Sequence, residues 1–204
     1  MAVTTLDPKS ALIVIDLQKG IMAAPTVHPI GEVIQRTASL VDAFRKNGMP
    51  IVFVVVTGVS PGRTEQHRSG GGSRSADWAE VVPELKVQPE DLTVRKQTWG
   101  AFTGTGLGDH LKALGVTQVV LTGIATSIGV ESTARQAYES GWHVTLAIDA
   151  MTDINADAHI NSLTRVFPKL GESGTTEEIL VLLSAGSRNG GGPPDIFAHM
   201  PMDN

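Results

Sequence analysis

Two charged residues stand at the ends of apolar runs and could form a catalytic pair. Asp16 ends the run ALIVID, and Lys96 follows the segment DLTVR. A carboxylate beside a poorly solvated strand must find a cationic partner or take up a proton, and Lys96 is the obvious cation. Alternatively, Asp16 could cap the following loop and Lys96 could remain a solvated surface charge, which is the usual fate of lysine.

A third candidate is the stretch LTGIATSIGVESTARQAY, in which a buried strand runs into a helix. Enzymes of the α/β class commonly keep a nucleophile at such a turn, but Gly129 has no side chain with which to attack. Thr126 and Ser127 supply hydroxyls, which we expect to bond locally because the G-x-S-x-G pattern of α/β-hydrolases is not satisfied. The backbone amides near Ala125 and Gly129 could hold a developing negative charge.

The sequence does not support thiol or metal chemistry. The chain contains no cysteine, which excludes a thiolate nucleophile, a disulfide framework and a Cys-ligated metal. Its six histidines form no pair at i, i+3 or i, i+4 spacing, so we expect no metal site. No cofactor is expected either.

Composition narrows the class of partner. The 204 residues are 41% hydrophobic and can bury one sizeable core. A net charge of −5 argues against nucleic acid and fits a small-molecule substrate. The N-terminus lacks a signal-peptide pattern, and no window approaches the roughly 18 apolar residues of a membrane span. We therefore expect a cytoplasmic protein that is not bound to a membrane.

Four short apolar runs predict the strands that must position these candidates. The runs are rich in Val and Ile and continuous rather than alternating, which is typical of parallel strands covered on both faces. A further strand is expected at DLTVRKQ, residues 91–97. The four runs are residues 11–16, 50–58, 118–125 and 143–150.

Segments with helical spacing lie between these strands. Three of them end at a glycine shortly before the next strand, as a helix C-cap should, at Gly48, Gly115 and Gly141. Strand alternating with helix predicts a single three-layer α/β/α domain over residues 1–183. Its doubly wound, mostly parallel sheet should have about six strands.

Two later helices are marked by their N-caps. Asn155 is expected to cap a helix within 155–167, and a threonine should cap a last helix within 175–183. The segment 60–78 is too long and too rich in Gly and Ser for an ordinary connection, so it is either a lid or plain disorder. The tail, 184–204, resembles a flexible extension.

Ligands of open parallel sheets bind at the carboxyl ends of the strands. That rule selects Asp16, Thr57, Lys96, Asp149 and the turn at 124–129, although capping of a helix explains Asp149 adequately. We therefore expect Asp16, Lys96 and the turn that holds Gly129 to converge.

Three ordered motifs resemble those of the isochorismatase-like hydrolases, a superfamily that includes nicotinamidases, carbamoylsarcosine amidases and isochorismatases. They are VIDLQKG, VRKQTWGAFTGTGL and LTGIATSIGVESTARQAYESGWHVTLAIDAMTD, and the likeness runs from about residue 10 to 183. Most members use an Asp–Lys–Cys triad. The resemblance therefore implies catalytic roles for Asp16 and Lys96, with Gly129 at the position of the cysteine.

The resemblance also implies a cis peptide bond between Ile124 and Ala125. It further implies a homo-oligomer, a dimer or tetramer, formed through helices flanking the 124–141 turn, with Trp78, Trp99 or the tail segment 196–200 contributing apolar contacts. Residues implied to form the oxyanion hole or bind substrate are Gln18, Trp99, Ile124, Ala125 and Ser127.

The isochorismatases proper are similar in lacking that cysteine, and they hydrolyse a vinyl ether rather than an amide. The resemblance thus implies hydrolysis of a vinyl ether such as isochorismate, with Asp16 as the acid that protonates the methylene carbon. A ligand-binding relative without this chemistry and a non-thiol amidase are the alternatives.

The chain departs from the isochorismatase pattern at one cationic position. Its motif KQTWGAF places Thr98 where K-x-R-Y-S-A-F has an arginine that would help bind a dicarboxylate. Arg63, Arg68 or Arg74 could replace that cation. The D-x-H metal motif of nicotinamidases is missing as well.

Overall fold

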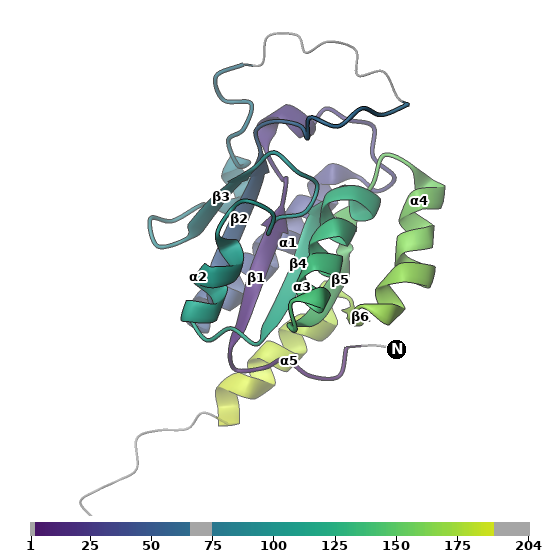
Figure 1. Ribbon diagram of the computed structural model, residues 1–204. Coiled ribbons are helices and arrows are strands. Elements are labelled where there is room, and N and C mark those ends of the chain that lie inside the picture. Colours follow the sequence, from purple (N-terminus) through teal and green to yellow (C-terminus); the bar gives the residue numbers. More distant parts are fainter. Residues whose placement is uncertain (1–2, 66–74, 190–204) are drawn as a thin grey trace, which may run out of the picture.

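All six strands of the central sheet run parallel, and four of them, β1, β2, β4 and β5, are the continuous apolar runs of the sequence. The computed structural model describes residues 3–65 and 75–189 (Figure 1). The strand order is β3-β2-β1-β4-β5-β6. The strands are β1 (Ser10–Ile15), β2 (Ile51–Val56), β3 (Leu92–Lys96), β4 (Gln118–Ile124), β5 (His143–Thr152) and β6 (Glu172–Gly174).

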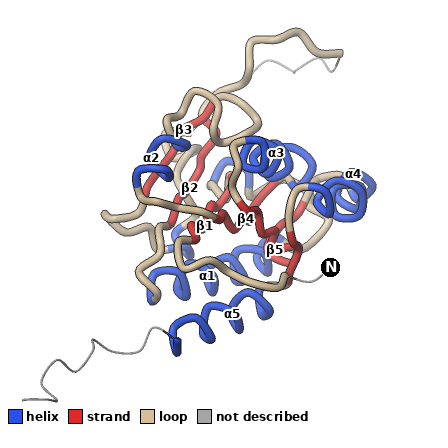
Figure 2. The backbone as a smooth tube through the Cα atoms, turned by 60° about the horizontal axis from the view of Figure 1, so that its bottom comes forward, coloured by secondary structure: helices blue, strands red, loops and turns tan. Residues whose placement is uncertain are grey.

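Two layers of helices enclose the sheet (Figure 2). On one face lie α1 (Ile30–Lys46) and α5 (Thr176–Asn189). The other face is covered by α2 (Leu107–Ala113), α3 (Glu131–Glu139) and α4 (Ala156–Asn161). This three-layer α/β/α arrangement confirms the predicted fold class.

Strand β1 shows why the strand sequences are continuously apolar. Ile13 and Ile15 belong to the core beneath α2 and α3, whereas Leu12 and Val14 belong to the core beneath α1 and α5. Both faces of the strand are buried, so every side chain along it is removed from water. Alternation of apolar and polar residues would place polar groups in one of the two cores.

The order of the strands defines where a ligand site should lie. The chain builds outward from β1 through β2 to β3, and then returns to the other side of β1 with β4. The carboxyl ends of β1 and β4 therefore flank the point at which the winding direction reverses. Open α/β sheets bind their ligands in the crevice at this point.

Several helix boundaries follow from single residues. Gly48, Gly115 and Gly141 have φ angles of 63°, 70° and 88°, so each adopts the left-handed conformation that ends a helix. The Asn155 side chain accepts a hydrogen bond from the Ala158 amide at 2.9 Å and caps α4. These boundaries confirm the predicted C-caps and the predicted Asn155 N-cap.

The last helix is capped twice. Glu178 accepts a hydrogen bond from the Thr175 amide, while the Glu178 amide donates to the Thr175 hydroxyl, which is a capping box. Asp149 also accepts hydrogen bonds from the amide and the hydroxyl of Thr176. Asp149 thus does cap a helix, although that helix is α5 rather than the nearby α4.

The C-terminal boundary differs from the prediction. The expected flexible extension from residue 184 is wrong at its start, because α5 continues to Asn189. Leu183 is buried and packs α5 against the core, and the helix continues from this residue to Asn189. Residues 190–204 lie outside the described residues, as do residues 66–74 of the segment 60–78 that is expected to be a lid or disordered.

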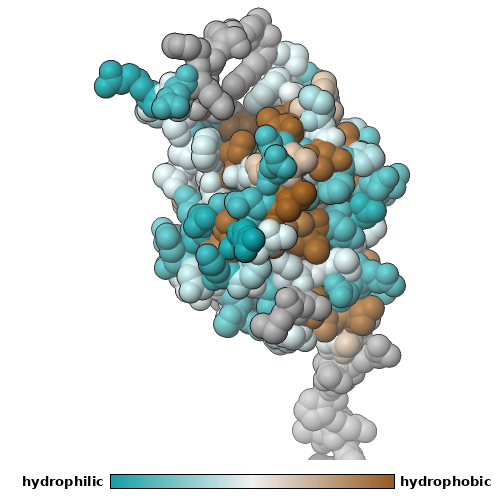
Figure 3. All heavy atoms as spheres, turned by 90° about the vertical axis from the view of Figure 1, so that its right-hand side faces the viewer, coloured by the Kyte–Doolittle hydropathy of each residue, from teal (hydrophilic) through white to brown (hydrophobic). Residues whose placement is uncertain are grey.

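The surface that carries α4 exposes hydrophobic side chains. Figure 3 shows the face that lies on the right of Figure 1, where hydrophobic surface gathers. Ile160 of α4 is 56% exposed, and Ile154, just before that helix, is 57% exposed. The expected self-association stays a prediction. Within residues 3–65 and 75–189, none of the helices has the length and apolar character needed to cross a bilayer.

The close packing around Gly123 predicts that a side chain at this position destabilises the fold. Its φ is 118°, and a Cβ atom added there would lie 2.0 Å from the carbonyl oxygen of Ile15. Gly123→Ala should therefore lower the free energy of unfolding by about 3 kcal/mol or more, measured by urea denaturation. The control is Gly31→Ala in α1, where an added Cβ would meet nothing within 4 Å. We expect the control to change stability by less than about 1 kcal/mol, and equal effects of the two changes would contradict this description of β4.

Candidate functional site

Asp16 and Lys96 form a buried ion pair at the carboxyl end of the sheet. Asp16 directly follows β1 and Lys96 is the last residue of β3, so the lysine side chain crosses the end of β2 to reach the carboxylate. The Lys96 Nζ atom lies 2.9 Å from Oδ2 of Asp16, and the two side chains are 1% and 9% exposed. The predicted convergence of these two residues is confirmed.

The backbone of Asp16 turns sharply where the strand ends. Its φ angle is 54°, in the left-handed region that few residues other than glycine adopt. Its amide still donates to the Val54 carbonyl at 2.9 Å, so the turn begins directly at the edge of the sheet. Such a conformation costs free energy and persists only when its surroundings fix it.

Gln18 helps to fix that turn. Its side-chain oxygen accepts a hydrogen bond from the Val56 amide at 2.8 Å, and its nitrogen donates to the carbonyls of Val56 and Trp78. The side chain is completely buried and is not among the residues that line the cavity. Gln18, expected as a substrate contact, thus ties the chain after β1 to the end of β2.

The two head groups of the pair differ in their remaining partners. Lys96 also donates a hydrogen bond to the carbonyl oxygen of Trp99. In contrast, Oδ1 of Asp16 is buried and accepts no hydrogen bond of good geometry from the described residues, and the Val56 amide, which lies near this carboxyl, donates to the Gln18 side chain. Because an unsatisfied buried oxygen is costly, this atom is where a ligand group would gain most by binding.

Burial changes the acidity of Asp16. Removal from water raises the pKa of its carboxyl from 3.8 to about 6, and the charge and hydrogen bond of Lys96 pull the pKa in the opposite direction. Burial therefore outweighs the cation. With this pKa, about one carboxyl in ten carries a proton at pH 7, and most do below pH 5. Asp16 can consequently act as an acid or as a base near neutral pH.

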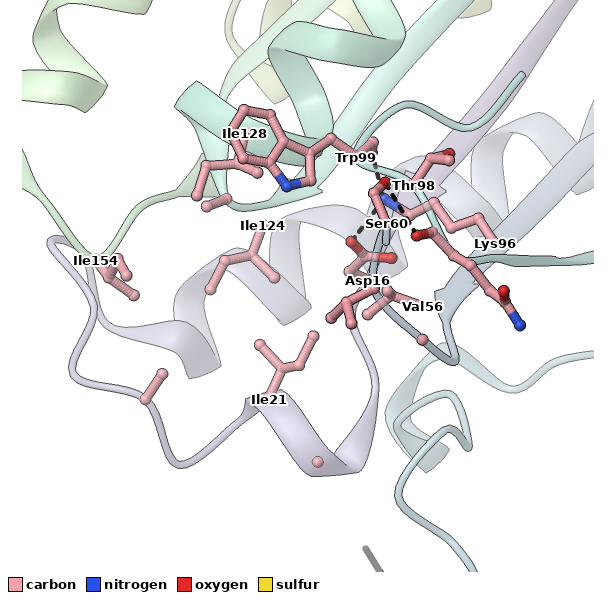
Figure 4. A pocket seen from close by; sticks show the side chains of 17 residues that line it. Asp16, Ile21, Val56, Ser60, Lys96, Thr98, Trp99, Ile124, Ile128 and Ile154 are labelled. Carbon is pink, nitrogen blue, oxygen red and sulfur yellow. Dashed lines mark hydrogen bonds and ion pairs between the residues drawn. The ribbon is translucent and has the colours of Figure 1, made fainter. Parts of the chain in front are cut away.

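A cavity of about 410 Å³ opens above this pair and has mainly apolar walls. Figure 4 shows the two charged groups at one side and Ile21, Ile124 and Ile154 at the other, and Trp99 and Ile128 also line the cavity. Among the described residues that line the cavity, Asp16 and Lys96 are the only ones with charged side chains. The Thr98 hydroxyl, also at the wall, donates to the Gly100 carbonyl.

The turn after β4 forms the floor beside the ion pair. The peptide bond between Ile124 and Ala125 is cis, at the position that the resemblance implies, and residues Thr126–Val130 form a π-helical turn that leads into α3. A Cβ atom added to Gly129 would lie 3.2 Å from Oδ2 of Asp16 and 3.3 Å from Nζ of Lys96. Gly129 therefore lies directly against both charged groups, and Ala125 lines the cavity with it.

The hydroxyl and amide groups of this turn have distant partners. The Thr126 hydroxyl donates to the carbonyl oxygen of Thr152, at the end of β5, so the expected local hydrogen bond is wrong for this residue. The Ser127 amide donates to the Asp153 carboxylate at 2.7 Å. Ser127 is not among the residues lining the cavity. The buried Asp153, which directly follows β5, thus holds the turn.

Sequence reasoning found the charged groups but missed much of the cavity wall. Of the expected binding residues, Trp99, Ile124 and Ala125 line the cavity. Ile21 and Ile154 were not identified, because isolated isoleucines in connections carry no periodic signal, whereas Ile128 lies in the turn at 124–129 that the sequence does indicate. Among residues 3–65 and 75–189, no group of three or more His, Asp or Glu side chains could hold a metal ion.

The fold and the site define an α/β protein with a buried Asp–Lys ion pair at the switch point of its sheet. A family model described as the isochorismatase domain matches residues 10–178, so the chain belongs to the isochorismatase family. Members of this family are hydrolases, including amidases.

Relatives of similar length support this assignment. The chain is 44% identical over 178 residues to the uncharacterized isochorismatase family protein YwoC of Bacillus subtilis (strain 168), covering 84% of this chain and 93% of the relative. It is 39% identical over 180 residues to the uncharacterized protein YecD of Escherichia coli O157:H7, covering 84% and 94%. A solved isochorismatase family protein from Burkholderia thailandensis superposes with a TM-score of 0.85 at 41% identity, covering 90% of this chain and 100% of that chain.

A more distant relative is named as an amidase. The ureidoacrylate amidohydrolase RutB of Variovorax paradoxus (strain S110) is 29% identical over 180 residues, covering 73% of this chain and 71% of the relative.

The opposing effects on Asp16 predict the result of removing the cation. Lys96→Met should raise the pKa of Asp16 above about 6, because burial is then no longer opposed by the ammonium group. The measurement is a carbon-13 NMR titration of the Asp16 carboxyl. Arg95→Met, at an exposed neighbouring position, is the control and should leave the titration in place. A lower pKa in Lys96→Met would contradict the described electrostatics.

Proposed function

We propose that this site hydrolyses a vinyl ether without a covalent intermediate, and that Asp16 is the general acid. The observation that carries the proposal is the buried Asp16 carboxyl, whose pKa is raised to about 6 and whose Oδ1 atom accepts no hydrogen bond of good geometry from the described residues. A vinyl ether needs chiefly a proton to become reactive, whereas an amide needs an attacking nucleophile. Gly129 stands beside Asp16 and supplies none.

The proposed reaction begins with proton transfer to carbon. The Asp16 carboxyl gives its proton to the terminal methylene carbon of the vinyl ether, and the electron pair of the C=C bond forms the new C–H bond. This leaves an oxocarbenium ion next to the newly ionised carboxylate. The negative charge of Asp16 is then opposite the positive charge of the intermediate, which stabilises it in a cavity with few other polar groups.

Water completes the reaction. A water molecule adds to the oxocarbenium carbon and loses a proton, which returns to Asp16. The resulting hemiketal breaks its bond to the ether oxygen, and its hydroxyl proton passes to that oxygen, which leaves as the alcohol. The products are an alcohol and a carbonyl compound, so the balance is one vinyl ether and one water consumed. Lys96 remains paired with Asp16 and limits how far burial can raise the pKa of that carboxyl.

We propose that Gly129 stands where most family members carry a cysteine, and that its missing side chain leaves room for the reacting carbon. An added Cβ would contact Asp16, Lys96 and Ile15 at 3.0 to 3.3 Å, so even a methyl group would occupy space against the acid. A thiol mechanism has no residue on which to form an acyl intermediate, since the chain has no cysteine.

The chemistry of the walls favours a substrate with an apolar body. An anionic group of the substrate buried against the isoleucines of the cavity wall would have no cationic partner, and its burial would cost on the order of several kcal/mol. The isoleucines are Ile21, Ile124, Ile128 and Ile154. Thr98 offers a hydroxyl rather than a cation at the wall. The proposal is therefore the reaction class, of which isochorismate is one example, and simple vinyl ethers are the better first substrates. A non-thiol amidase and a ligand-binding protein without turnover remain the alternatives.

The substrate panel tests the reaction class. Isochorismate, simple vinyl ethers, nicotinamide and N-carbamoyl compounds are offered to the wild type and to Asp16→Asn. We expect release of a carbonyl compound from a vinyl ether, and a loss of about 10²–10⁴-fold in kcat for Asp16→Asn with the fold retained by circular dichroism. Amide turnover by the wild type would overturn the proposed mechanism. Ligand binding without turnover by any compound would favour the non-catalytic alternative.

Gly129→Ala tests the proposed role of the empty position. The added methyl group should crowd substrate against Asp16 and raise KM for the active vinyl ether, with a smaller effect on kcat, because no reacting group is removed. Gly62→Ala is the matched control, since a Cβ there would meet nothing within 4 Å. A change in KM no larger than that of the control would mean that substrate does not approach Gly129.

A further inference from the structure

Two histidines far apart in the sequence meet behind the catalytic turn. The Nε2 atoms of His28 and His159 are 3.3 Å apart, and Nδ1 of His159 lies 2.9 Å from the hydroxyl oxygen of Thr126. His28 lies in the connection before α1 and is exposed, whereas His159 lies in α4 and is 3% exposed. The proposed hydrolysis uses neither side chain.

The hydrogen-bond partners fix the positions of the protons. The Thr126 hydroxyl donates its one proton to the carbonyl oxygen of Thr152, so it can only accept from His159. Neutral His159 must therefore carry its proton on Nδ1 and present a lone pair at Nε2. His28 then donates from its own Nε2–H, and the chain of donors runs from His28 through His159 and Thr126 to Thr152.

This chain joins two walls of the cavity. The segment leading to His28 carries Ile21 and Ala24 into the cavity wall, and Thr126 belongs to the turn that contributes Ile128 and Gly129. The Val27 amide donates to the Asp153 carbonyl at 2.8 Å, and the His28 amide donates to the Thr152 hydroxyl at 3.0 Å. The imidazole pair adds a side-chain connection between the same segment and α4.

We propose that His28 and His159 form a latch that holds the wall formed by residues 21–28, and that the latch opens when both imidazoles are protonated. One added proton leaves the contact intact, because His28 still donates to a lone pair on His159. A second proton places an N–H on both Nε2 atoms, so two donors and two positive charges face each other across 3.3 Å. The contact is then repulsive.

The charges around the two imidazoles determine the pH at which the latch opens. Burial lowers the pKa of His159, the neighbouring His28 lowers it further, and Asp153 acts in the opposite direction. Glu131 of α3 accepts a hydrogen bond from Ser162, and Asp157 of α4 is exposed. The segment 22–27 and the turn 126–130 contribute no other titratable side chain. The latch should therefore stay closed at neutral pH and open in acid, below the ordinary histidine pKa of about 6.5.

Amide hydrogen exchange measures the latch without any substrate. The protection factors of the Val27 and His28 amides are followed from pH 7.5 to pH 4.5 in the wild type, His28→Ala and His28→Gln. We expect the wild-type protection to fall about tenfold or more on acidification and His28→Ala to be poorly protected throughout. His28→Gln should stay protected, because its amide can donate to neutral His159 and, turned over, accept from protonated His159.

Two results of the exchange experiment would contradict the latch. Wild-type protection in His28→Ala at neutral pH, or an acid-induced loss in His28→Gln equal to that of the wild type, would overturn the latch. Nitrogen-15 NMR gives a second reading, because neutral His159 must be the Nδ1–H tautomer, and an Nε2–H tautomer would overturn the proton assignment. Neither measurement depends on turnover, so failure of the latch and failure of the proposed hydrolysis are distinguishable.

Discussion

The buried pair of Asp16 and Lys96 is the constraint on which the rest of the site depends. Two charges removed from water at this depth are held only if each meets the other, and removing one partner from such a pair commonly costs about 3–5 kcal/mol. The sheet order meets this requirement by placing the ends of β1 and β3 on either side of β2. Because folding raises the pKa of Asp16 to about 6, the stability contributed by its protonated form is lost as the pH rises toward that value.

The position of the pair also determines which backbone features surround it. Asp16 adopts a left-handed backbone conformation. The Gln18 side chain uses its hydrogen bonds to hold the chain that follows Asp16. Gly129 lies where a side chain would contact both charged groups. These features are costly for a protein that needs only a stable core, whereas they are expected around a group that must exchange a proton with a ligand. Membership of the isochorismatase family agrees with a catalytic role, and the absence of a side chain at Gly129 is the basis for proposing ether rather than amide chemistry.

Sequence reasoning reached the fold and the charged pair because both depend on signals that are local in the chain. Continuous apolar runs predict parallel strands, and residues at their carboxyl ends meet at one edge of the sheet, which is why Asp16 and Lys96 could be identified. The partners of Gln18 and Thr126, and the contact between His28 and His159, depend on how connections cross one another in space. No spacing along the chain encodes such contacts.

The most direct test of the catalytic role of Asp16 is the pH dependence of kcat/KM for a vinyl ether, measured between pH 5.5 and pH 8. If the protonated carboxyl is the acid, kcat/KM should be highest below the Asp16 pKa of about 6 and should fall about tenfold per pH unit above it. The same carboxyl acting as a base would give the opposite profile. A value of kcat/KM that rises through pH 6 and stays high to pH 8 would contradict the proposal that Asp16 works as an acid.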